Sequence, residues 1–223
     1  VIKKTISALK IVNTATGIKK RMLEAHTHED EEDHKDSQKD HKDSHKDHKD
    51  SHGEENTEDH DGIPDPHIWL SPQLVKKQAK HIYTALMEVD PAGEDVYKAG
   101  YDLLIKELSD IDFQLKSALA PFKGNTIFVY HPAFGYFTDR YGLKQVAIET
   151  GGKKPVPSVL NEIIEHAKEE RVKIIFVQPE FSRASAQSIA EAIGGIVVSL
   201  NPLNPDYINN LKSIAAEIKR AFR

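Results

Sequence analysis

The chain has 223 residues, of which 39% are apolar, and a formal charge of −5 at pH 7. This apolar content is enough for a hydrophobic core. Residues 26–61 hold fifteen acidic residues against five lysines, a local balance of −10 that leaves the remainder near +5, so the small, unclustered basic excess argues against nucleic-acid binding. The absence of cysteine excludes disulfides and thiolate metal sites, and no apolar run approaches the ~20 residues of a membrane-spanning helix.

The first part of the chain combines a short apolar run with a long polar tract. Residues 9–14 predict a short buried strand, followed by a turn in which Gly17 can adopt a positive φ. Residues 26–61 predict a disordered loop, because they have almost no apolar side chains to bury and their like charges repel.

Histidine is concentrated in this tract. Imidazoles among carboxylates on a flexible backbone can capture a divalent ion, and zinc accepts both ligand types. The alternative is an acidic, solvated linker in which histidine is incidental. Eight of the twelve histidines lie here, at His26, His28, His34, His41, His45, His48, His52 and His60.

Two helices are expected after the tract. Ser71 and Pro72 form an N-cap and first-turn pair, which predicts a helix through about Met87. Apolar residues then recur at three- and four-residue spacing from Asp90 to Leu119. A helix of about thirty residues spans roughly 45 Å, enough to bridge two lobes.

From Pro121 onward, predicted strands and helices alternate. Near-continuous apolar strands alternating with amphipathic helices indicate an α/β fold with a parallel sheet covered on both faces, in which ligands bind at the carboxyl ends of the strands. The strands are expected at 126–130, 144–149, 173–178 and 195–200, and the helices from His131, from Ser158 to about Glu170, over 183–193 and over 205–222.

Three polar residues lie at or just beyond such strand ends. His131 directly follows the strand 126–130, Asn201 follows 195–200, and Glu180 lies two residues beyond 173–178. At a helix N-terminus the dipole disfavours protonation of His131 and leaves a nitrogen lone pair for a metal. The alternative is a histidine that only caps or packs.

His67 is the second candidate ligand, in the segment DPHIWLSP at 65–72. Neighbouring prolines make its backbone rigid, and Trp69 can anchor the segment in a core. The alternative is a surface histidine in a tryptophan-anchored turn. His81 and His166 fall among charged residues of predicted helices and are expected to be solvated.

Together these motifs resemble the metal-binding solute receptors of ABC importers for zinc and manganese, in particular the ZnuA-like, zinc-type members. The resemblance covers roughly residues 62–222. It depends on DPHIWLSP at 65–72, YHPAFGYFTDRYGL at 130–143, the stretch from Val156 through IIEHAKEERVKIIFVQPEFS, and SLNPL at 199–203. A histidine-rich acidic loop ahead of the DPH motif is typical of the zinc-type members.

The resemblance implies a fold and a set of metal ligands. The fold is two parallel-sheet α/β lobes linked by one long rigid helix. His67 and His131 match two histidine ligands of the family, and imidazole at position 131 favours Zn²⁺ over Mn²⁺. Asn201 occupies a position that is aspartate in manganese-type members, and Glu180 is a weaker fourth candidate because Gln178 stands where the family more often has an acidic residue.

The resemblance also implies a domain organisation. Residues 1–89 are expected to be the remainder of an N-terminal lobe that includes the loop, 90–120 the linking helix, and 121–223 the C-terminal α/β lobe. The family's first histidine ligand lies in a part of the N-terminal lobe that this sequence mostly lacks. We therefore expect an N-terminally truncated chain that binds zinc more weakly than the full-length protein would.

The implied function is capture of Zn²⁺, with Mn²⁺ as the alternative, by a monomeric periplasmic or extracytoplasmic receptor, soluble or lipid-anchored. Its partner would be an ABC permease, and no reaction would be catalysed. Two alternatives remain. One is a metal buffer or adhesin acting through the histidine-rich loop; the other is a zinc hydrolase using Glu180 as base, for which the sequence lacks an HExxH pair.

Overall fold

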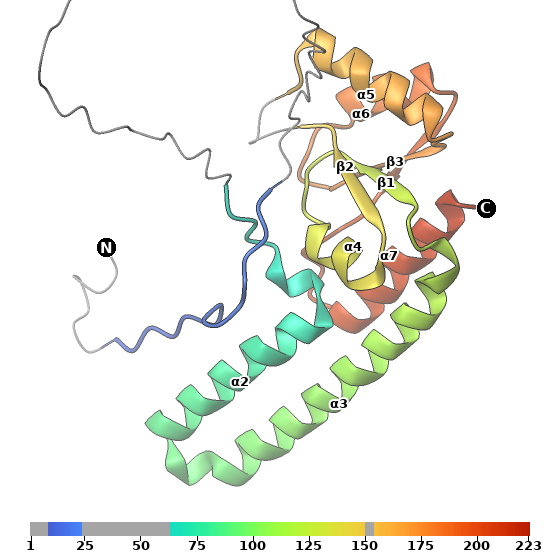
Figure 1. The fold of residues 1–223 in the computed structure, drawn as a ribbon. Helices are drawn as coiled ribbons and strands as arrows, with labels where there is room; N and C mark the ends of the chain where they lie inside the picture. Colours follow the sequence, from blue (N-terminus) through green and yellow to red (C-terminus); the bar gives the residue numbers. More distant parts are fainter. Residues whose placement is uncertain (1–8, 24–62, 150–153) are drawn as a thin grey trace, which may run out of the picture.

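The structure, a computed structural model, describes residues 9–23, 63–149 and 154–223. An α/β lobe forms the body of this part, and a pair of helices projects from it (Figure 1). The pair consists of α2 (Pro72–Val89) and α3 (Glu94–Leu119), joined by the 3₁₀ turn Pro91–Gly93. A second 3₁₀ turn, Ile68–Leu70, precedes α2, and a third, Ala120–Phe122, follows α3.

The lobe is built on one parallel sheet of four strands. The strands are β1 (Thr126–Val129), β2 (Lys144–Ala147), β3 (Ile174–Val177) and β4 (Ile196–Ser199), in the spatial order β2-β1-β3-β4. Every neighbouring pair is parallel, with Thr126 opposite Lys144 and Ile174 opposite Ile196. This confirms the α/β class and the parallel sheet expected from the sequence.

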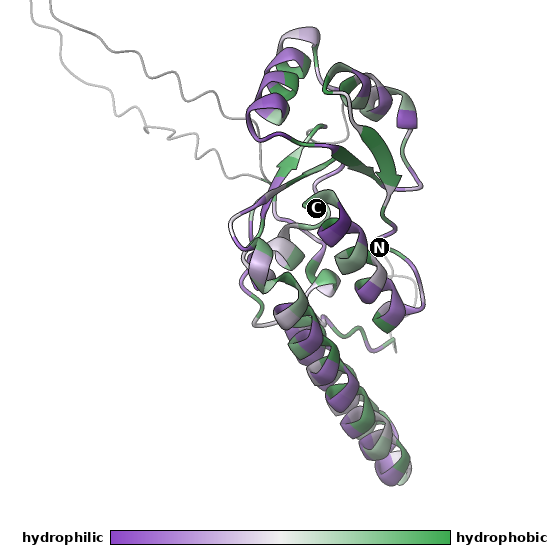
Figure 2. Ribbon diagram, turned by 90° about the vertical axis from the view of Figure 1, so that its right-hand side faces the viewer, coloured by the Kyte–Doolittle hydropathy of each residue, from purple (hydrophilic) through white to green (hydrophobic). Residues whose placement is uncertain are grey.

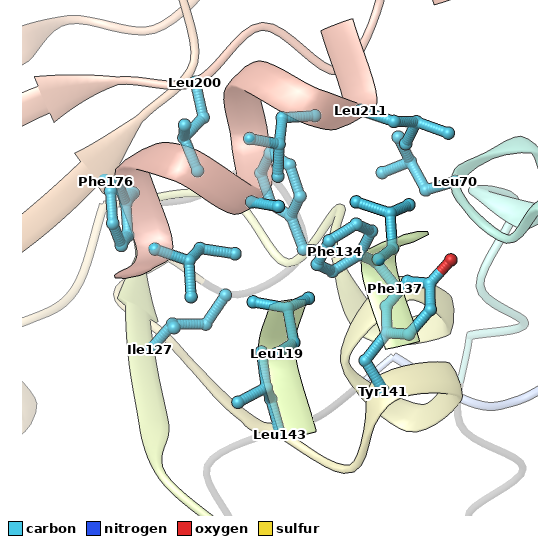
Figure 3. Packing of buried hydrophobic residues seen from close by; sticks show 14 of the residues in the cluster. Leu70, Leu119, Ile127, Phe134, Phe137, Tyr141, Leu143, Phe176, Leu200 and Leu211 are labelled. Atoms are coloured by element: carbon cyan, nitrogen blue, oxygen red, sulfur yellow. The ribbon is translucent and has the colours of Figure 1, made fainter. Parts of the chain in front are cut away.

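Helices cover both faces of the sheet. The helices α5 (Pro157–Glu169) and α6 (Arg183–Ala192) lie on one face, and α4 (Gly135–Tyr141) and α7 (Tyr207–Ala221) on the other (Figure 1). Buried side chains on the α4–α7 face come from β1, β3, α4, α7 and the C-terminal part of α3. Figure 3 shows these side chains packed together, with Phe134, Phe137 and Leu119 in the centre. The opposite face is filled by a second cluster that includes Phe128, Ile175 and Ile189.

The projecting helices are amphipathic, and part of their apolar surface is open. Apolar and polar residues alternate along the projecting helices, which overlap in the view of Figure 2. Leu108, Ile111, Leu115 and Leu119 of α3 are buried in the lobe, whereas Val96 and Leu103, nearer its start, are exposed. A groove of about 440 Å³ between α2 and α3 is lined mainly by apolar and aromatic side chains, including Ile82 and Leu104.

A buried carboxylate ties both helices to the lobe. Asp112 of α3 accepts hydrogen bonds from Arg140 Nε of α4 at 2.8 Å, from Gln73 Nε2 of α2 at 2.7 Å and from the Tyr141 hydroxyl at 3.2 Å. Burial by itself would raise the pKa of Asp112, but these hydrogen bonds, led by that of Arg140, outweigh it and lower the pKa. The carboxylate is therefore a charged junction between three helices.

The prediction of a buried strand at 9–14 is wrong. Residues 9–13 have no regular secondary structure, and Leu9, Ile11 and Val12 are exposed. A short apolar run forms a strand only where a neighbouring strand accepts its backbone hydrogen bonds. The turn that follows is as expected, since Gly17 has φ +71°.

Some expected helix starts are also corrected. The segment after β1 does not become helical at His131, because Pro132 disfavours helical backbone in the preceding residue, and α4 begins only at Gly135. The dipole argument for His131 therefore does not apply. Pro157 opens α5 with Val156 as N-cap, so Ser158 lies inside the helix instead of capping it. The predicted loop at 26–61 and its eight histidines lie outside the described residues.

Candidate metal centre

Two histidines from distant parts of the chain meet at the carboxyl edge of the sheet. His131 lies just beyond β1, and His67 lies immediately before the turn Ile68–Leu70. Their Nε2 atoms are 3.3 Å apart, and their rings lie edge to face with centroids 5.1 Å apart and planes at 77°. The structure thus brings together the two residues that the sequence singled out as ligands.

A buried carboxylate holds His67 from behind. Asp65 is fully buried, and its Oδ1 accepts a hydrogen bond from the backbone N–H of His67 at 2.8 Å. The same oxygen lies 2.7 Å from Nδ1 of the imidazole. The Asp-Pro-His order makes this possible, because two residues of separation allow a side-chain oxygen to turn back onto the following backbone.

A second buried carboxylate holds His131 in the same way. Glu149, which is 1% exposed and follows β2, contacts Nδ1 of His131 through Oε1. Gln178, directly after β3, fixes the backbone of His131 on both sides: its Nε2 donates to the His131 carbonyl at 2.7 Å and its Oε1 accepts from the His131 N–H at 3.2 Å. The residues that follow the adjacent strands β2 and β3 therefore orient His131, the candidate ligand that follows β1.

The two carboxylates determine which nitrogens can bind a metal. An imidazole whose Nδ1 faces a carboxylate carries its proton there and leaves the Nε2 lone pair free. With both protons on Nδ1, the Nε2 lone pairs of His67 and His131 would face each other. Zinc–nitrogen bonds of about 2.05 Å at a tetrahedral angle place two nitrogens about 3.3 Å apart, which equals the observed separation. The charges of Asp65 and Glu149 would balance those of a divalent ion.

Aromatic rings cover the flanks of the pair. Phe181 stacks on His131, with ring centroids 4.9 Å apart and planes at 20°. Trp69 meets His67 edge-on at 5.3 Å, and its indole Nε1 donates to the Pro202 carbonyl at 3.0 Å. Apolar walls of this kind exclude water and strengthen electrostatic interactions within the site.

The weaker candidates are less closely involved. Asn201 is half-buried, and its Oδ1 accepts a hydrogen bond from the Leu203 N–H at 2.8 Å. Glu180 is exposed in the turn after β3. Of the two histidines expected to be solvated, His166 is exposed as predicted. The expectation is wrong for His81, which is half-buried with Nε2 3.0 Å from the Thr16 carbonyl. Within residues 9–23, 63–149 and 154–223, no group of three or more His, Asp or Glu side chains is placed to hold an ion.

Sequence reasoning missed the residues behind the two histidines. Glu149 carried the same signal as His131, because it also follows a strand of the sheet, but it was included in the predicted strand 144–149. Asp65 belongs to the segment DPHIWLSP, but the sequence alone assigned it no role. Nothing in the sequence predicts that Phe181 stacks on His131.

The lobe is α/β, and two imidazoles face each other at the carboxyl edge of its sheet, each backed by a carboxylate. These features are those of a candidate metal-binding protein of the α/β class. Comparison with known proteins then gives the family. The chain belongs to the ZnuA family, described as zinc-uptake complex component A, periplasmic, which matches residues 1–221. This confirms the resemblance recognised in the sequence, and because the family is one of binding proteins, it also agrees with the expectation that the chain is not an enzyme.

Relatives and solved structures support this assignment. The chain is 33% identical over 141 residues to the high-affinity zinc uptake system protein ZnuA of Bacillus subtilis, an alignment that covers 62% of this chain and 44% of the relative. Over 160 residues it is 31% identical to the zinc-binding lipoprotein AdcA of Streptococcus pneumoniae, covering 68% of this chain and 32% of the relative. The chain thus spans less than half the length of these two relatives.

The fold agrees with that of a crystal structure of ZnuA, with a TM-score of 0.80 and 31% identity over 99% of this chain and 73% of that one. A ZnuA deletion mutant with zinc bound gives a TM-score of 0.78, with 30% identity over 99% of this chain and 72% of that one.

Proposed function

We propose that this chain is a zinc receptor that captures Zn²⁺ between His67 and His131 and delivers it to an ABC permease. The observation that carries the proposal is the 3.3 Å separation of two Nε2 atoms whose Nδ1 atoms both face carboxylates. No bond of the cargo is made or broken. The protein supplies two neutral nitrogen donors, fixes their direction and balances the charge of the ion.

Zinc is the favoured cargo because both donors are imidazoles. Imidazole suits zinc, whereas manganese prefers oxygen ligands. Zinc in a closed site takes four ligands, so two further positions must be filled. Water, Asn201 and Glu180 are the candidates among the described part of the chain, and a further protein ligand from outside that part would complete a tighter site.

The same proposal extends to the domain organisation. Residues 1–89 would belong to one lobe, 90–120 would form the linking helix, and 121–223 would form the second lobe. The apolar groove between α2 and α3 supports this division, because a packed lobe would cover such a surface. The exposed Val96 and Leu103 of α3 lie on the part of the helix that the second lobe does not bury.

Location and partner follow from the relatives. The family is described as periplasmic and AdcA as a lipoprotein, which supports an extracytoplasmic receptor, soluble or lipid-anchored. The proposal includes that the receptor acts as a monomer beside its permease. Among the described residues, no helix is long and apolar enough to span a bilayer.

Calorimetric titration of zinc tests the proposed site. Removing residues 26–61, whose histidines can bind zinc independently, isolates the site formed by His67 and His131. In that background we expect one site, and His67→Ala or His131→Ala should weaken it by at least 100-fold. His166→Ala, an exposed residue of α5 whose ring contacts Phe128 and neither candidate ligand, is the matched control and should leave the affinity within twofold. A fragment that binds no zinc, or that binds equally without the two histidines, would refute the receptor assignment.

A metal buffer or adhesin acting through residues 26–61 is the second candidate. One structural neighbour, at 29% identity and a TM-score of 0.67 over 72% of this chain and 65% of that one, is described as a laminin-binding protein of Streptococcus agalactiae with adhesin and metal transporting activity. The same deletion separates the two functions, since a buffer would lose nearly all of its zinc binding and a receptor would keep one site.

A further inference from the structure

The two ends of the histidine-rich segment are joined directly beside the metal site. Met22 and Pro64 form an antiparallel bridge, with hydrogen bonds of 2.8 Å from Leu23 N to the Ile63 carbonyl and from Asp65 N to the Arg21 carbonyl. We call residues 21–23 and 63–65 the neck. The last residue of the neck is Asp65, the carboxylate that holds His67.

The side chain of Arg21 lies in the neck between two carboxylates. Its Nη1 is 3.4 Å from Asp65 Oδ2, and its Nε is 3.1 Å from Asp139 Oδ2. The side chain is only 17% exposed. Asp65 therefore uses one oxygen for His67 and the other for Arg21. Because Arg21 is shared with Asp139, it offsets only part of the buried charge of Asp65.

Neighbouring residues are shaped to hold Arg21 in this place. The Tyr136 hydroxyl accepts a hydrogen bond from the Arg21 N–H at 3.0 Å and donates to the Asp65 carbonyl at 3.1 Å, which joins the two halves of the neck. The guanidinium crosses Gly135 so closely that a Cβ added there would lie 1.2 Å from Nη1. Glycine at the start of α4 thus leaves the space that the guanidinium occupies.

From this geometry we propose that Arg21 is a positioning residue of the metal site, acting on His67 through Asp65. With the guanidinium in place, Asp65 keeps Oδ1 on Nδ1 of His67, and Nε2 points at His131. Without it, the uncompensated carboxylate turns toward solvent and releases the imidazole. The proposal rests on the zinc-binding function proposed above, because the orientation of His67 matters only if its Nε2 binds a metal.

A double-mutant cycle tests this on the full chain, with the eight histidines of residues 26–61 replaced by serine in every variant. Zinc affinity is measured by competition with a chromophoric chelator. Removing a residue that holds a metal-ligating histidine in place typically weakens metal affinity 10–100-fold. Arg21→Met should therefore weaken zinc binding by that factor, and Arg21→Lys should recover part of the loss. Lys20→Met, the loss of an exposed charge one residue earlier, should change the affinity less than twofold.

Gly135→Ala provides the second arm of the cycle. The added methyl group meets the end of a flexible side chain, so it should displace the guanidinium without unfolding α4. Gly135→Ala should lower zinc affinity in the parent chain. In a chain that already carries Arg21→Met, it should have little further effect. Additive effects would show that the two residues act separately and would overturn the proposal.

The tautomer of His67 gives a readout that does not depend on zinc. In ¹⁵N NMR of the metal-free protein, the parent chain should show the Nδ1-protonated form, and Arg21→Met should shift it toward a mixture. An unchanged tautomer together with unchanged zinc affinity would overturn the role of Arg21. Loss of zinc binding in the parent chain itself would instead refute the proposed function, so the two failures are distinguishable.

Discussion

Replacing Glu149 by glutamine tests whether the carboxylate behind His131 contributes to metal binding. Glutamine keeps the size of the side chain and an oxygen that can accept from Nδ1, but it removes the charge. The carboxylate lies roughly 6 Å from the expected ion, at which distance charges of −1 and +2 attract by about 5.5 kcal/mol at an effective dielectric constant of ~20. The amide dipole and rearranged water offset part of this. We therefore expect a 10–100-fold loss of affinity, or about 1.4–2.8 kcal/mol.

The assay is competition for zinc with a chromophoric chelator, in the chain without residues 26–61. Glu169→Gln is the matched control, because it removes the same charge from an exposed position at the end of α5. Its affinity should stay within twofold of the parent. If Glu149→Gln binds zinc as the parent does, the reasoning from buried carboxylates is refuted, and a loss of affinity in Glu180→Gln would then identify the exposed residue as a ligand.

Three further predictions concern pH, stability and the fourth ligand position. Protons compete with zinc for imidazole nitrogens, whose ordinary pKa is ~6.5, so affinity should fall steeply between pH 7 and pH 5; calorimetry that shows no pH dependence would exclude histidine ligation. Because its hydrogen bonds lower the pKa of Asp112, its contribution to stability is present above about pH 4 and is lost as pH falls further. Asp112→Asn should lower the free energy of unfolding by about 2–3 kcal/mol, measured by urea unfolding at pH 7. This is less than for a fully buried ion pair, because Arg140 is a third exposed. An unchanged urea midpoint would contradict the prediction. Asn201→Ala should change zinc affinity less than threefold, since Oδ1 already accepts from the Leu203 N–H, and a larger loss would identify it as a ligand.

The strands and helices of the lobe could be predicted because each carries a local signal. The apolar runs around Phe128 and Ile175 are buried on both faces of the sheet, and such strands read as continuous hydrophobic segments. The same rule located His131, since ligands gather where parallel strands end. His67 followed from a rigid, proline-flanked segment. These predictions needed no knowledge of tertiary contacts.

The remaining features depend on contacts between distant residues. The apolar run at 9–14 would form a strand only if a neighbouring strand paired with it. Six residues do not encode whether such a partner exists, and Leu9, Ile11 and Val12 are exposed. The pairing of Glu149 with His131 and of Arg21 with Asp65 joins residues 18 and 44 positions apart. Carboxylates and guanidinium groups are common on surfaces, so their burial becomes visible only in the folded chain.

The antiparallel contact of Met22 with Pro64 has a consequence for how members of this family can diverge. Leu23 and Ile63, the described residues on either side of positions 24–62, are hydrogen-bonded to each other. Residues gained or lost between them need not displace either one, so we expect insertions and deletions to be tolerated there. The number and spacing of histidines in that stretch could then change while His67 and His131 keep their positions.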